Sequence, residues 1–293
     1  MQKIRKAVMP VAGLGTRVLP ATKSIPKEMM PVVDRPAIQY VVDEARAAGI
    51  EHIVFVTGRN KGAIEDYFDR AYELEVTLRD KNKKDLLAKI TSEIPQAGST
   101  SFVRQQVPLG LGHAIWCARD VIGNEPFAVL LPDVLVKSHT ACLAQMVDAY
   151  EKVGGNIIAV DQVPQERVSS YGVIAPKNRD GRLIEMSGMV EKPAQDQAPS
   201  NLKITGRYIL QPEIMTLLSN QAAGAGGEIQ LTDAMARLMA DQPFHAYEYE
   251  GQDYDCGSKL GYFETVLAYA MDHPEIGTQV HETIHKLCAK LSS

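Results

Sequence analysis

Cysteine is scarce in this sequence, and the few cysteines are far apart. The four residues Cys117, Cys142, Cys256 and Cys288 include no Cys-x-x-Cys pair. This spacing indicates neither a disulfide framework nor a zinc site of the usual kind. Dispersed, reduced thiols are typical of proteins in a reducing compartment, and we expect a cytoplasmic location.

Long hydrophobic runs and an excess of positive charge are also missing. The apolar run near the N-terminus is interrupted by Arg5 and Lys6, which argues against a signal peptide or a membrane span there. The formal net charge is −5 at pH 7, which argues against a dedicated nucleic-acid-binding protein. We therefore expect neither a nucleic-acid nor a membrane partner. Any polyanionic ligand has to be held by local basic residues rather than by a global field.

The first half of the chain alternates between strand and helix patterns. Short runs rich in Val, Ile and Phe predict strands at 4–11, 52–57, 101–104 and 127–131. Helices are predicted between them at 36–48, 61–70 and 112–120, and the charged segment 77–100 is expected to be a solvated helix with flanking loops. Such alternation predicts a parallel sheet with helices on both faces and ligands at the carboxyl ends of the strands.

The second half adds strands at 156–160, 171–175, 183–190, 204–210 and 244–249, and helices at 212–219, 228–240 and 259–271. In the last helix Leu260, Phe263, Leu267 and Met271 recur at helical spacing, so we expect them to face the core. The sequence contains no segment with the composition of a linker and no internal repeat. We predict a single α/β domain with a Rossmann-like, three-layer architecture, in which a mixed, mainly parallel sheet carries helices on both faces.

A glycine-rich loop follows the first predicted strand. Gly13 and Gly15 precede Thr16 and Arg17, and Lys27 lies ten residues further on. Glycines let backbone N–H groups approach a phosphate, and the two cations add positive charge. No Gly-Lys-Ser/Thr follows, so the loop is not a P-loop, and Val18 stands where the dinucleotide fingerprint has a third glycine. Alone, the loop could equally be an ordinary tight turn.

Two further segments have both an ordinary and a functional interpretation. The segment 104–114 leads from a strand into a helix. It is either a simple βα loop or a base pocket in which Gln105 can both donate to and accept from a nucleobase. Asp133 ends a buried strand and Asp255 precedes a helix. Each could cap a helix, but two carboxylates together with substrate phosphates would suit Mg²⁺.

Two motifs in the second half of the chain also have two interpretations each. Glu191 could accept hydrogen bonds from sugar hydroxyls and Lys192 could bind a phosphate, although a surface pair of this kind is usually just solvated. His281-Glu-Thr-Ile-His285 matches a zinc motif. Nothing downstream supplies a third ligand, so we interpret it as a solvated helix face.

The motifs are more specific together than separately. The loop at 13–17 and the segment Pro-Lys-Glu-Met-Met-Pro at 26–31 resemble those of the sugar-nucleotide pyrophosphorylases, in particular the bacterial UTP–glucose-1-phosphate uridylyltransferases. Gln105, Asp133, the Val-Glu-Lys-Pro block at 190–193 and Asp255 keep the order of that family. The resemblance extends to about residue 271, and it implies the nucleotide-diphospho-sugar transferase fold.

The resemblance also implies an activity and a set of roles. The reaction converts UTP and glucose 1-phosphate into UDP-glucose and pyrophosphate with Mg²⁺ as cofactor. The implied catalytic residues are Arg17, Lys27, Asp133 and Lys192; the nucleotide-binding residues are Ala12, Gly13, Gly15, Gln105 and Gly110; the sugar-phosphate-binding residues are Gly172, Glu191, Lys192 and Glu228; and the metal ligands are Asp133 and Asp255. The family often carries a basic residue two positions before the second aspartate, where this chain has Asp253.

The same resemblance suggests how the chain is organised. Residues 1–135 would bind the nucleotide, 136–258 the sugar phosphate, and 259–293 would form C-terminal helices that serve a dimer or tetramer. Two alternatives remain open from the residues. One is a non-catalytic regulator that binds nucleotide sugars. The other is a sister pyrophosphorylase that uses dTTP or another sugar 1-phosphate, because thymine differs from uracil by one methyl group.

Overall fold

A computed structural model describes residues 1–220, 222, 224 and 227–291. Positions 221, 223, 225 and 226 of the expected sugar-phosphate-binding half, and 292 and 293 of the expected C-terminal part, lie outside the described residues. A nine-stranded sheet crosses the molecule in the order β5-β4-β1-β6-β11-β8-β12-β10-β9. The strands are β1 (Lys6–Pro10), β4 (His52–Thr57), β5 (Thr100–Arg104), β6 (Phe127–Leu130), β8 (Asn156–Gln162), β9 (Gly172–Asp180), β10 (Leu183–Glu191), β11 (Leu202–Leu210) and β12 (Phe244–Glu248).

The sheet is mixed, and most of its strands run in one direction. Strands β5, β4, β1 and β6 are parallel to one another, and β12 is parallel to β8. Strand β11 runs antiparallel to β6 and β8, and β10 runs antiparallel to β12 and β9. Only β10 and β11 therefore run opposite to the other strands of this sheet. This agrees with the predicted mixed, mainly parallel sheet.

Alternation along β1 shows how the sheet buries both faces. Val8 packs into one hydrophobic cluster, whereas its neighbours Ala7 and Met9 pack into the other, because successive side chains of a strand point to opposite faces. The face of Val8 is covered by α5 (Leu111–Cys117), α8 (Ile214–Ser219) and α9 (Leu231–Leu238). The face of Met9 is covered by α1 (Ala37–Ala47), α2 (Gly62–Phe68) and α7 (Cys142–Val153). This is the predicted three-layer arrangement.

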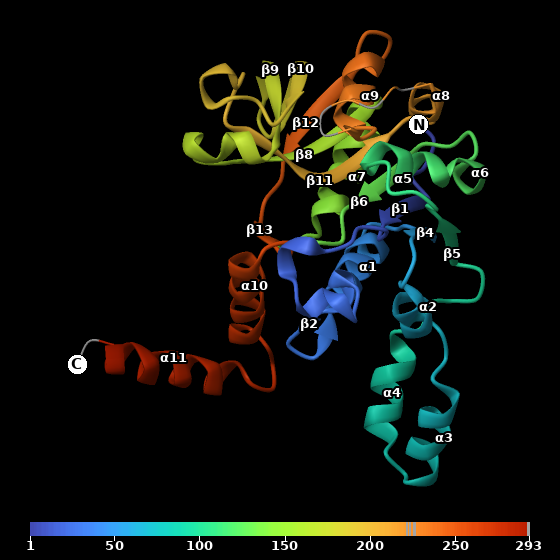
Figure 1. The fold of residues 1–293 in the computed structure, drawn as a ribbon, viewed down its shortest axis with the longest axis vertical. Helices are drawn as coiled ribbons and strands as arrows, with labels where there is room; N and C mark the ends of the chain where they lie inside the picture. Colours follow the sequence, from blue (N-terminus) through green and yellow to red (C-terminus); the bar gives the residue numbers. More distant parts are fainter. Residues whose placement is uncertain (221, 223, 225–226, 292–293) are drawn as a thin grey trace.

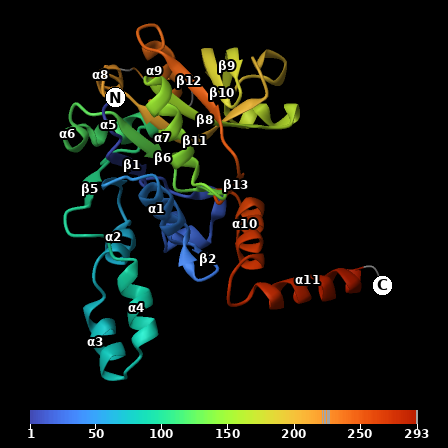
Figure 2. The same cartoon turned by 180° about the vertical axis from the view of Figure 1, so that it is seen from behind.

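Some elements differ from the sequence prediction. The helix expected at 112–120 is divided into α5 and the single turn α6 (Arg119–Ile122). The charged segment forms two helices, α3 (Tyr72–Asp80) and α4 (Lys84–Ser92), which project together from the body (Figures 1 and 2). The short strands β2 (Pro31–Val32) and β3 (Arg35–Pro36) pair with each other, as do β7 (Val134–Lys137) and β13 (Gln252–Asp255).

The C-terminal helices correct one prediction. Helix α10 (Lys259–Met271) begins and ends as expected, but the proposed core stripe does not face the core: Leu260 is 67% exposed and Phe263 is 62% exposed. The helix instead packs through Tyr262, whose hydroxyl donates to the Pro31 carbonyl at 2.7 Å, and through buried Thr265. The face with Tyr262 and Thr265, rather than the predicted apolar stripe, packs against the N-terminal part of the chain.

The last helix, α11 (Gly277–Leu291), extends away from the body of the molecule (Figures 1 and 2). Leu287 and Leu291 are exposed on it, and so are His281 and His285 of the zinc-like motif. None of the helices in the described part of the chain is both long and apolar enough to cross a membrane.

Candidate active site

The loops after the parallel strands gather at one edge of the sheet. Ala12 and Gly13 follow β1, and Gly58 follows the neighbouring strand β4. The two loops are in contact, since a Cβ placed on Gly58 would lie 3.3 Å from the carbonyl oxygen of Ala12. Asp133 follows β6 on the other side of β1. The carboxyl ends of parallel strands therefore bring these three segments together, as the alternation predicts.

The glycine-rich loop needs a glycine at position 15. Gly15 has a φ angle of +66°, which favours glycine, and a Cβ there would lie 3.2 Å from the Cβ of Lys27. The carbonyl oxygen of Gly15 also accepts a hydrogen bond of 2.7 Å from the hydroxyl of Thr22. The loop is thus folded closely against the segment that carries Lys27.

Lys27 and Asp133 form an ion pair at this edge. The Lys27 Nζ lies 2.6 Å from the Asp133 Oδ2, and both side chains are mostly buried. Burial alone would raise the pKa of Asp133, but the attraction of the Lys27 ammonium outweighs it, with help from Arg17, so the pKa lies below its ordinary value. The pKa of Lys27 is raised: burial opposes the charge, but the Asp133 carboxylate overcomes it. Both groups are therefore charged at neutral pH.

Asp255 reaches the same place from the far end of the sequence. Strand β13 pairs with β7 so that Asp255 stands opposite Val134, next to Asp133. A Cβ placed on Gly257 would lie 2.8 Å from Asp255 Oδ1, 3.1 Å from Arg17 Nη2 and 3.3 Å from Asp133 Oδ2. Two carboxylates and one guanidinium therefore surround a glycine, which leaves room between them.

Two carboxylates, those of Asp133 and Asp255, lie beside Gly257. Among residues 1–220, 222, 224 and 227–291, no group of three or more His, Cys, Asp or Glu side chains is arranged to hold a metal ion. Any divalent ion here would need further oxygen atoms from a ligand or from water.

A cavity of about 220 Å³ opens beside this cluster. Its lining includes Arg17, Asp133 and Asp255 together with Gly172 and Glu191. The β9–β10 pairing places Gly172 directly opposite Glu191, which explains why two residues far apart in sequence share one wall. The cavity therefore joins the predicted phosphate-binding and sugar-binding residues.

Thr232 is a residue of this wall to which the sequence analysis assigned no role. Its hydroxyl donates a hydrogen bond of 2.8 Å to Glu191 Oε2, and the side chain is buried at the start of α9. This bond fixes one carboxylate oxygen of Glu191. The sequence analysis assigned the nearby Glu228 to the sugar phosphate, but nothing in the sequence indicated that the threonine contacts Glu191.

Lys192 is placed differently from the other cations. Its side chain is 60% exposed, its Nζ lies 3.6 Å from Glu191 Oε1, and it does not line the cavity beside Glu191. Its backbone has a φ angle of +46°, and its N–H donates to the Tyr171 carbonyl at 3.0 Å. A lysine in the left-handed region is uncommon and is held there by its surroundings.

A second buried ion pair explains the unusual Asp253. The Nζ of buried Lys203, on β11, lies 2.6 Å from Asp253 Oδ2, and both residues line the 220 Å³ cavity. Lys203 also lies over the ring of Tyr171, with its Nζ 5.2 Å from the ring centroid. Asp253 is therefore neutralised by a cation from another strand. Sequence reasoning missed Lys203, which lies one residue before the strand predicted at 204–210.

The predicted base-binding loop forms a separate part of the site. The Nε2 of buried Gln105 donates to the Gly110 carbonyl oxygen at 3.1 Å. Gly110 has a φ angle of +107°, and a Cβ there would lie 2.9 Å from the Ile229 carbonyl oxygen. Glu228 contacts the same glycine and does not line the cavity of Glu191. The structure thus places Glu228 beside the base loop.

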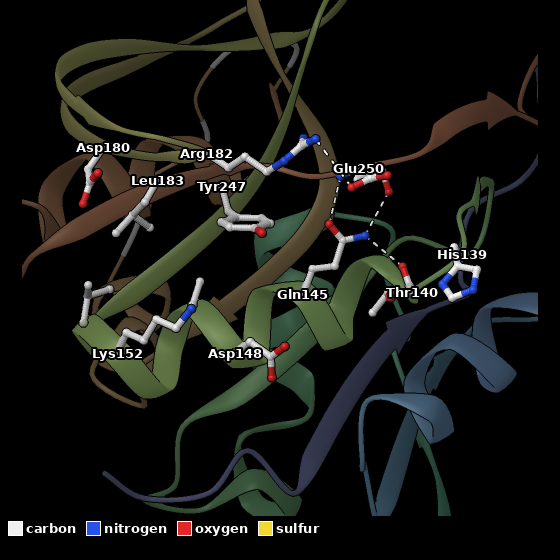
Figure 3. Close-up of a pocket in the computed structure, with 12 residues that line it drawn as sticks. His139, Thr140, Gln145, Asp148, Lys152, Asp180, Arg182, Leu183, Tyr247 and Glu250 are labelled. Carbon is white, nitrogen blue, oxygen red and sulfur yellow. Dashed lines mark hydrogen bonds and ion pairs between the residues drawn. The ribbon is translucent and has the colours of Figure 1, made fainter.

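A larger cavity, of about 630 Å³, lies elsewhere, along α7 (Figure 3). Its central side chain, Gln145, donates to the carbonyls of Thr140 and Glu250 at 2.8 and 2.9 Å and accepts from the Glu250 N–H at 2.8 Å. Arg182 approaches the Glu250 carboxylate at 3.5 Å. These groups satisfy one another, and the predicted site residues lie elsewhere.

The sequence is similar to characterised transferases over nearly its whole length. The profile of the nucleotidyl transferase family matches residues 6–271. The chain is 51% identical over 280 residues to UTP–glucose-1-phosphate uridylyltransferase of Bacillus subtilis (strain 168), and this match covers 96% of each of the two chains. It is 50% identical over 287 residues to the protein of the same name from Staphylococcus haemolyticus (strain JCSC1435), which covers 98% of this chain and 99% of that one.

Solved structures lead to the same family. A UTP-bound UGPase from Acinetobacter baumannii superposes with a TM-score of 0.90 at 51% identity and covers 97% of this chain and 99% of its own. A UDP-glucose pyrophosphorylase complexed with UDP-glucose superposes with a TM-score of 0.83 at 47% identity and covers 91% of this chain and 98% of its own. These similarities confirm the resemblance and the α/β fold that the sequence predicts.

Proposed function

Because this chain belongs to the nucleotidyl transferase family, we propose that it makes UDP-glucose and pyrophosphate from UTP and glucose 1-phosphate. The uridylyltransferase relatives match it over almost their full length, and their structures include complexes with UTP and with UDP-glucose. The observation that carries the proposal is the convergence of Arg17, Asp133 and Asp255 on Gly257, in one cavity with Gly172 and Glu191.

The chemistry is an in-line displacement at the α-phosphorus of UTP. An ionised phosphate oxygen of glucose 1-phosphate forms the new bond to this phosphorus, while the bond from the α-phosphorus to the bridging oxygen breaks and pyrophosphate leaves with its electron pair. The attacking oxygen is already ionised at neutral pH, so no general base is needed. The protein has to bring two anions together and stabilise the charge of the transition state, so positioning and electrostatics supply the catalysis.

The cations of the site suit these tasks. Lys192, whose side chain is exposed beside Glu191, would bind the attacking phosphate. Arg17 and Lys27, which both lie beside Asp133, would offset the charge of the departing pyrophosphate. Glu191, fixed by Thr232, would accept hydrogen bonds from sugar hydroxyls, and Gly172 would contact the sugar through its backbone.

The acidic residues fit Mg²⁺. Carboxylate oxygens of both Asp133 and Asp255 lie near the Cβ position of Gly257, so the two aspartates offer hard oxygen atoms to the same space. Mg²⁺ prefers a few carboxylate ligands completed by phosphate and water oxygens. Asp133 and Asp255 would therefore hold the ion, whose contribution would be to neutralise phosphate charge. Asp253 pairs with Lys203, and its carboxylate is not among the three groups nearest to the Cβ position of Gly257.

The nucleotide would lie against the loops of residues 1–135. Ala12, Gly13 and Gly15 line the folded loop after β1, and Gln105 and Gly110 form the base loop after β5. The sugar phosphate would lie against residues 136–258, which contribute Gly172, Glu191 and Lys192. The contact of Glu228 with Gly110 supports a role for Glu228 near the base rather than near the sugar. The dispersed cysteines support a cytoplasmic location.

Pyrophosphate release tests the proposal. Purified protein should release pyrophosphate from UTP and glucose 1-phosphate in the presence of Mg²⁺, and the rate should fall strongly when the metal is chelated. Parallel assays with dTTP, ATP, CTP and GTP determine the base preference. Preference for dTTP would support a sister pyrophosphorylase. Tight UDP-glucose binding without release from any nucleotide would support a non-catalytic regulator and refute the enzymatic proposal.

Lys192→Ala tests the role of the exposed lysine. Its turnover should fall by about 10²–10³-fold, the loss typical of removing one group that stabilises the transition state. Lys177→Ala is the matched control, because Lys177 is a similarly exposed lysine paired with a glutamate, at 56% exposure. Near-normal turnover of Lys192→Ala would refute this role.

The exposed C-terminal helices support a homo-oligomer, either a dimer or a tetramer. Leu260 and Phe263 of α10 and Leu287 and Leu291 of α11 are all exposed, although they are large and apolar. An isolated helix of the length of α11 is marginal in water, and helices gain most of their stability by burying an apolar face. A second copy of the chain offers the same apolar groups in return, so a symmetric contact would cover both.

A further inference from the structure

The orientation of the Gln105 amide follows from its neighbours. Its nitrogen lies 3.1 Å from the Gly110 carbonyl oxygen and 2.9 Å from Nδ1 of His113. A carbonyl oxygen can only accept, so the amide atom that faces Gly110 has to be the nitrogen, which donates. The second N–H of the same nitrogen then faces His113, whose Nδ1 has to accept it. This arrangement requires a neutral His113 that carries its proton on Nε2.

The surroundings of His113 favour that neutral form. Burial lowers the pKa of His113, and the nearby Arg119 guanidinium lowers it further. The ring stacks on Trp116, with centroids 5.8 Å apart, and the Cys117 Sγ lies 3.9 Å from Nδ1. Burial raises the pKa of the Cys117 thiol, so this neighbour is also uncharged near pH 7. Glu228, which packs against Gly110, adds a further charged side chain near this loop.

The fixed amide leaves one atom for a ligand. Within the described part of the chain, no hydrogen bond engages the Gln105 oxygen, whereas its nitrogen makes two. The side chain therefore offers an acceptor and withholds its donors. Uracil and thymine carry a donor at N3, whereas cytosine carries an acceptor there. Two facing acceptors repel each other, so an amide held in this orientation discriminates between these bases.

We propose that His113 is a positioning residue that, together with the Gly110 carbonyl, holds the Gln105 amide so that its oxygen accepts the N3–H of uracil and rejects cytosine. This inference rests on the proposed function, in which Gln105 contacts the base. It adds a residue that acts through Gln105 and the hydrogen-bond polarity that selects the base.

The kinetic test compares UTP with CTP in variants of His113. His113→Leu removes the acceptor, so the KM for UTP should rise about tenfold with little change in kcat, and the preference for UTP over CTP should fall by a similar factor. His113→Asn should keep the preference, because its side-chain oxygen can accept where Nδ1 does. His245→Leu, at a similarly half-buried histidine on β12, is the control and should behave as the wild type.

A spectroscopic test does not depend on the variants' folding. Nitrogen-15 NMR of the imidazoles in the wild-type protein should show His113 with an unprotonated Nδ1 and a protonated Nε2 near pH 7, both without ligand and with UDP-glucose. A proton on Nδ1, or an imidazolium, would overturn the inference. The same holds for a His113→Leu enzyme that keeps the full UTP preference. The wild type's failure to release pyrophosphate from any nucleotide would refute the proposed function. The NMR result refutes only the inference about His113, so the two failures can be told apart.

Discussion

The buried pair of Lys61 and Glu28 allows a quantitative prediction. The Lys61 Nζ lies 2.8 Å from Glu28 Oε2, with side-chain exposures of 6% and 0%. No residue in the described part of the chain hydrogen-bonds to Glu28 Oε1. Burial raises the pKa of Glu28 above its ordinary value of 4.5, although the ammonium groups of Lys61 and Lys27 pull it down. Lys61→Met would leave this carboxyl buried without its partner, and it should then take up a proton rather than stay charged.

The cost of that proton sets the magnitude. Protonating a carboxyl costs about 1.4 kcal/mol for each unit by which the pH of the solution exceeds its ordinary pKa. Protonating Glu28 near pH 7 therefore costs at most about 3 kcal/mol. The wild-type pKa is already raised, so the measured loss should lie between about 1 and 3 kcal/mol. A pKa raised in the folded state means that the folded state binds more protons. The loss should therefore be smallest near pH 4.5 and should grow as the pH rises towards the folded-state pKa.

Urea denaturation of wild type and Lys61→Met across this pH range measures the effect. The double variant Glu28→Gln with Lys61→Met has no carboxyl to titrate, so its difference from the wild type should lose most of this pH dependence. Lys177→Met, in an exposed pair with Glu185, should lose no more than about 0.5 kcal/mol at any pH. A loss for Lys61→Met that is the same at all pH values would refute the reasoning, because it would then come from packing rather than from charge.

Three further predictions concern the site and the assembly. Gly257→Ala should lower turnover at least about a hundredfold without unfolding the protein, because its Cβ would crowd the Asp255 carboxylate; normal pyrophosphate release would show that this space is not used. Thr232→Val should raise the KM for glucose 1-phosphate about tenfold because Glu191 loses a donor, and Thr232→Ser should restore it; an unchanged KM would remove the threonine from the sugar site. Phe263→Glu should shift the mass measured by light scattering to that of a monomer, unless another surface joins the copies.

The sequence predicted the sheet well because its signals are local. Strand β4 and helix α10 begin and end at the predicted residues, since short β-branched runs and helical spacing are visible in any window. Helix α7 received no prediction, and its N-cap residue, Ala141, makes no side-chain capping bond. The core face of α10 was predicted wrongly, because apolar residues lie almost all round this helix. Which stripe is buried depends on the segment that packs against it.

The same limit applies to the site. Residues at strand ends, such as Asp133, could be anticipated because parallel strands bring their carboxyl ends to one edge. The partners of site residues could not, because the pairs of Lys203 with Asp253 and of Lys61 with Glu28 join segments 50 and 33 residues apart. Such pairs depend on the order of strands and on the paths of loops, which periodicity does not reveal.

These pairings give a chain of net charge −5 fixed positive charge where we propose that two polyanions bind. Lys27 and Lys203 are mostly buried and fixed at 2.6 Å from a carboxylate, so they are preorganised and their charge is balanced before any substrate arrives. Lys192 is exposed and only loosely paired, so its ammonium can reorient at little cost. A fixed set of charges favours one geometry of the reacting phosphates, whereas a side chain that can reorient can follow the incoming phosphate. If the proposed function holds, Lys192 would therefore be the cation best able to accompany the attacking group, and its left-handed backbone angle would be a local strain held for that role.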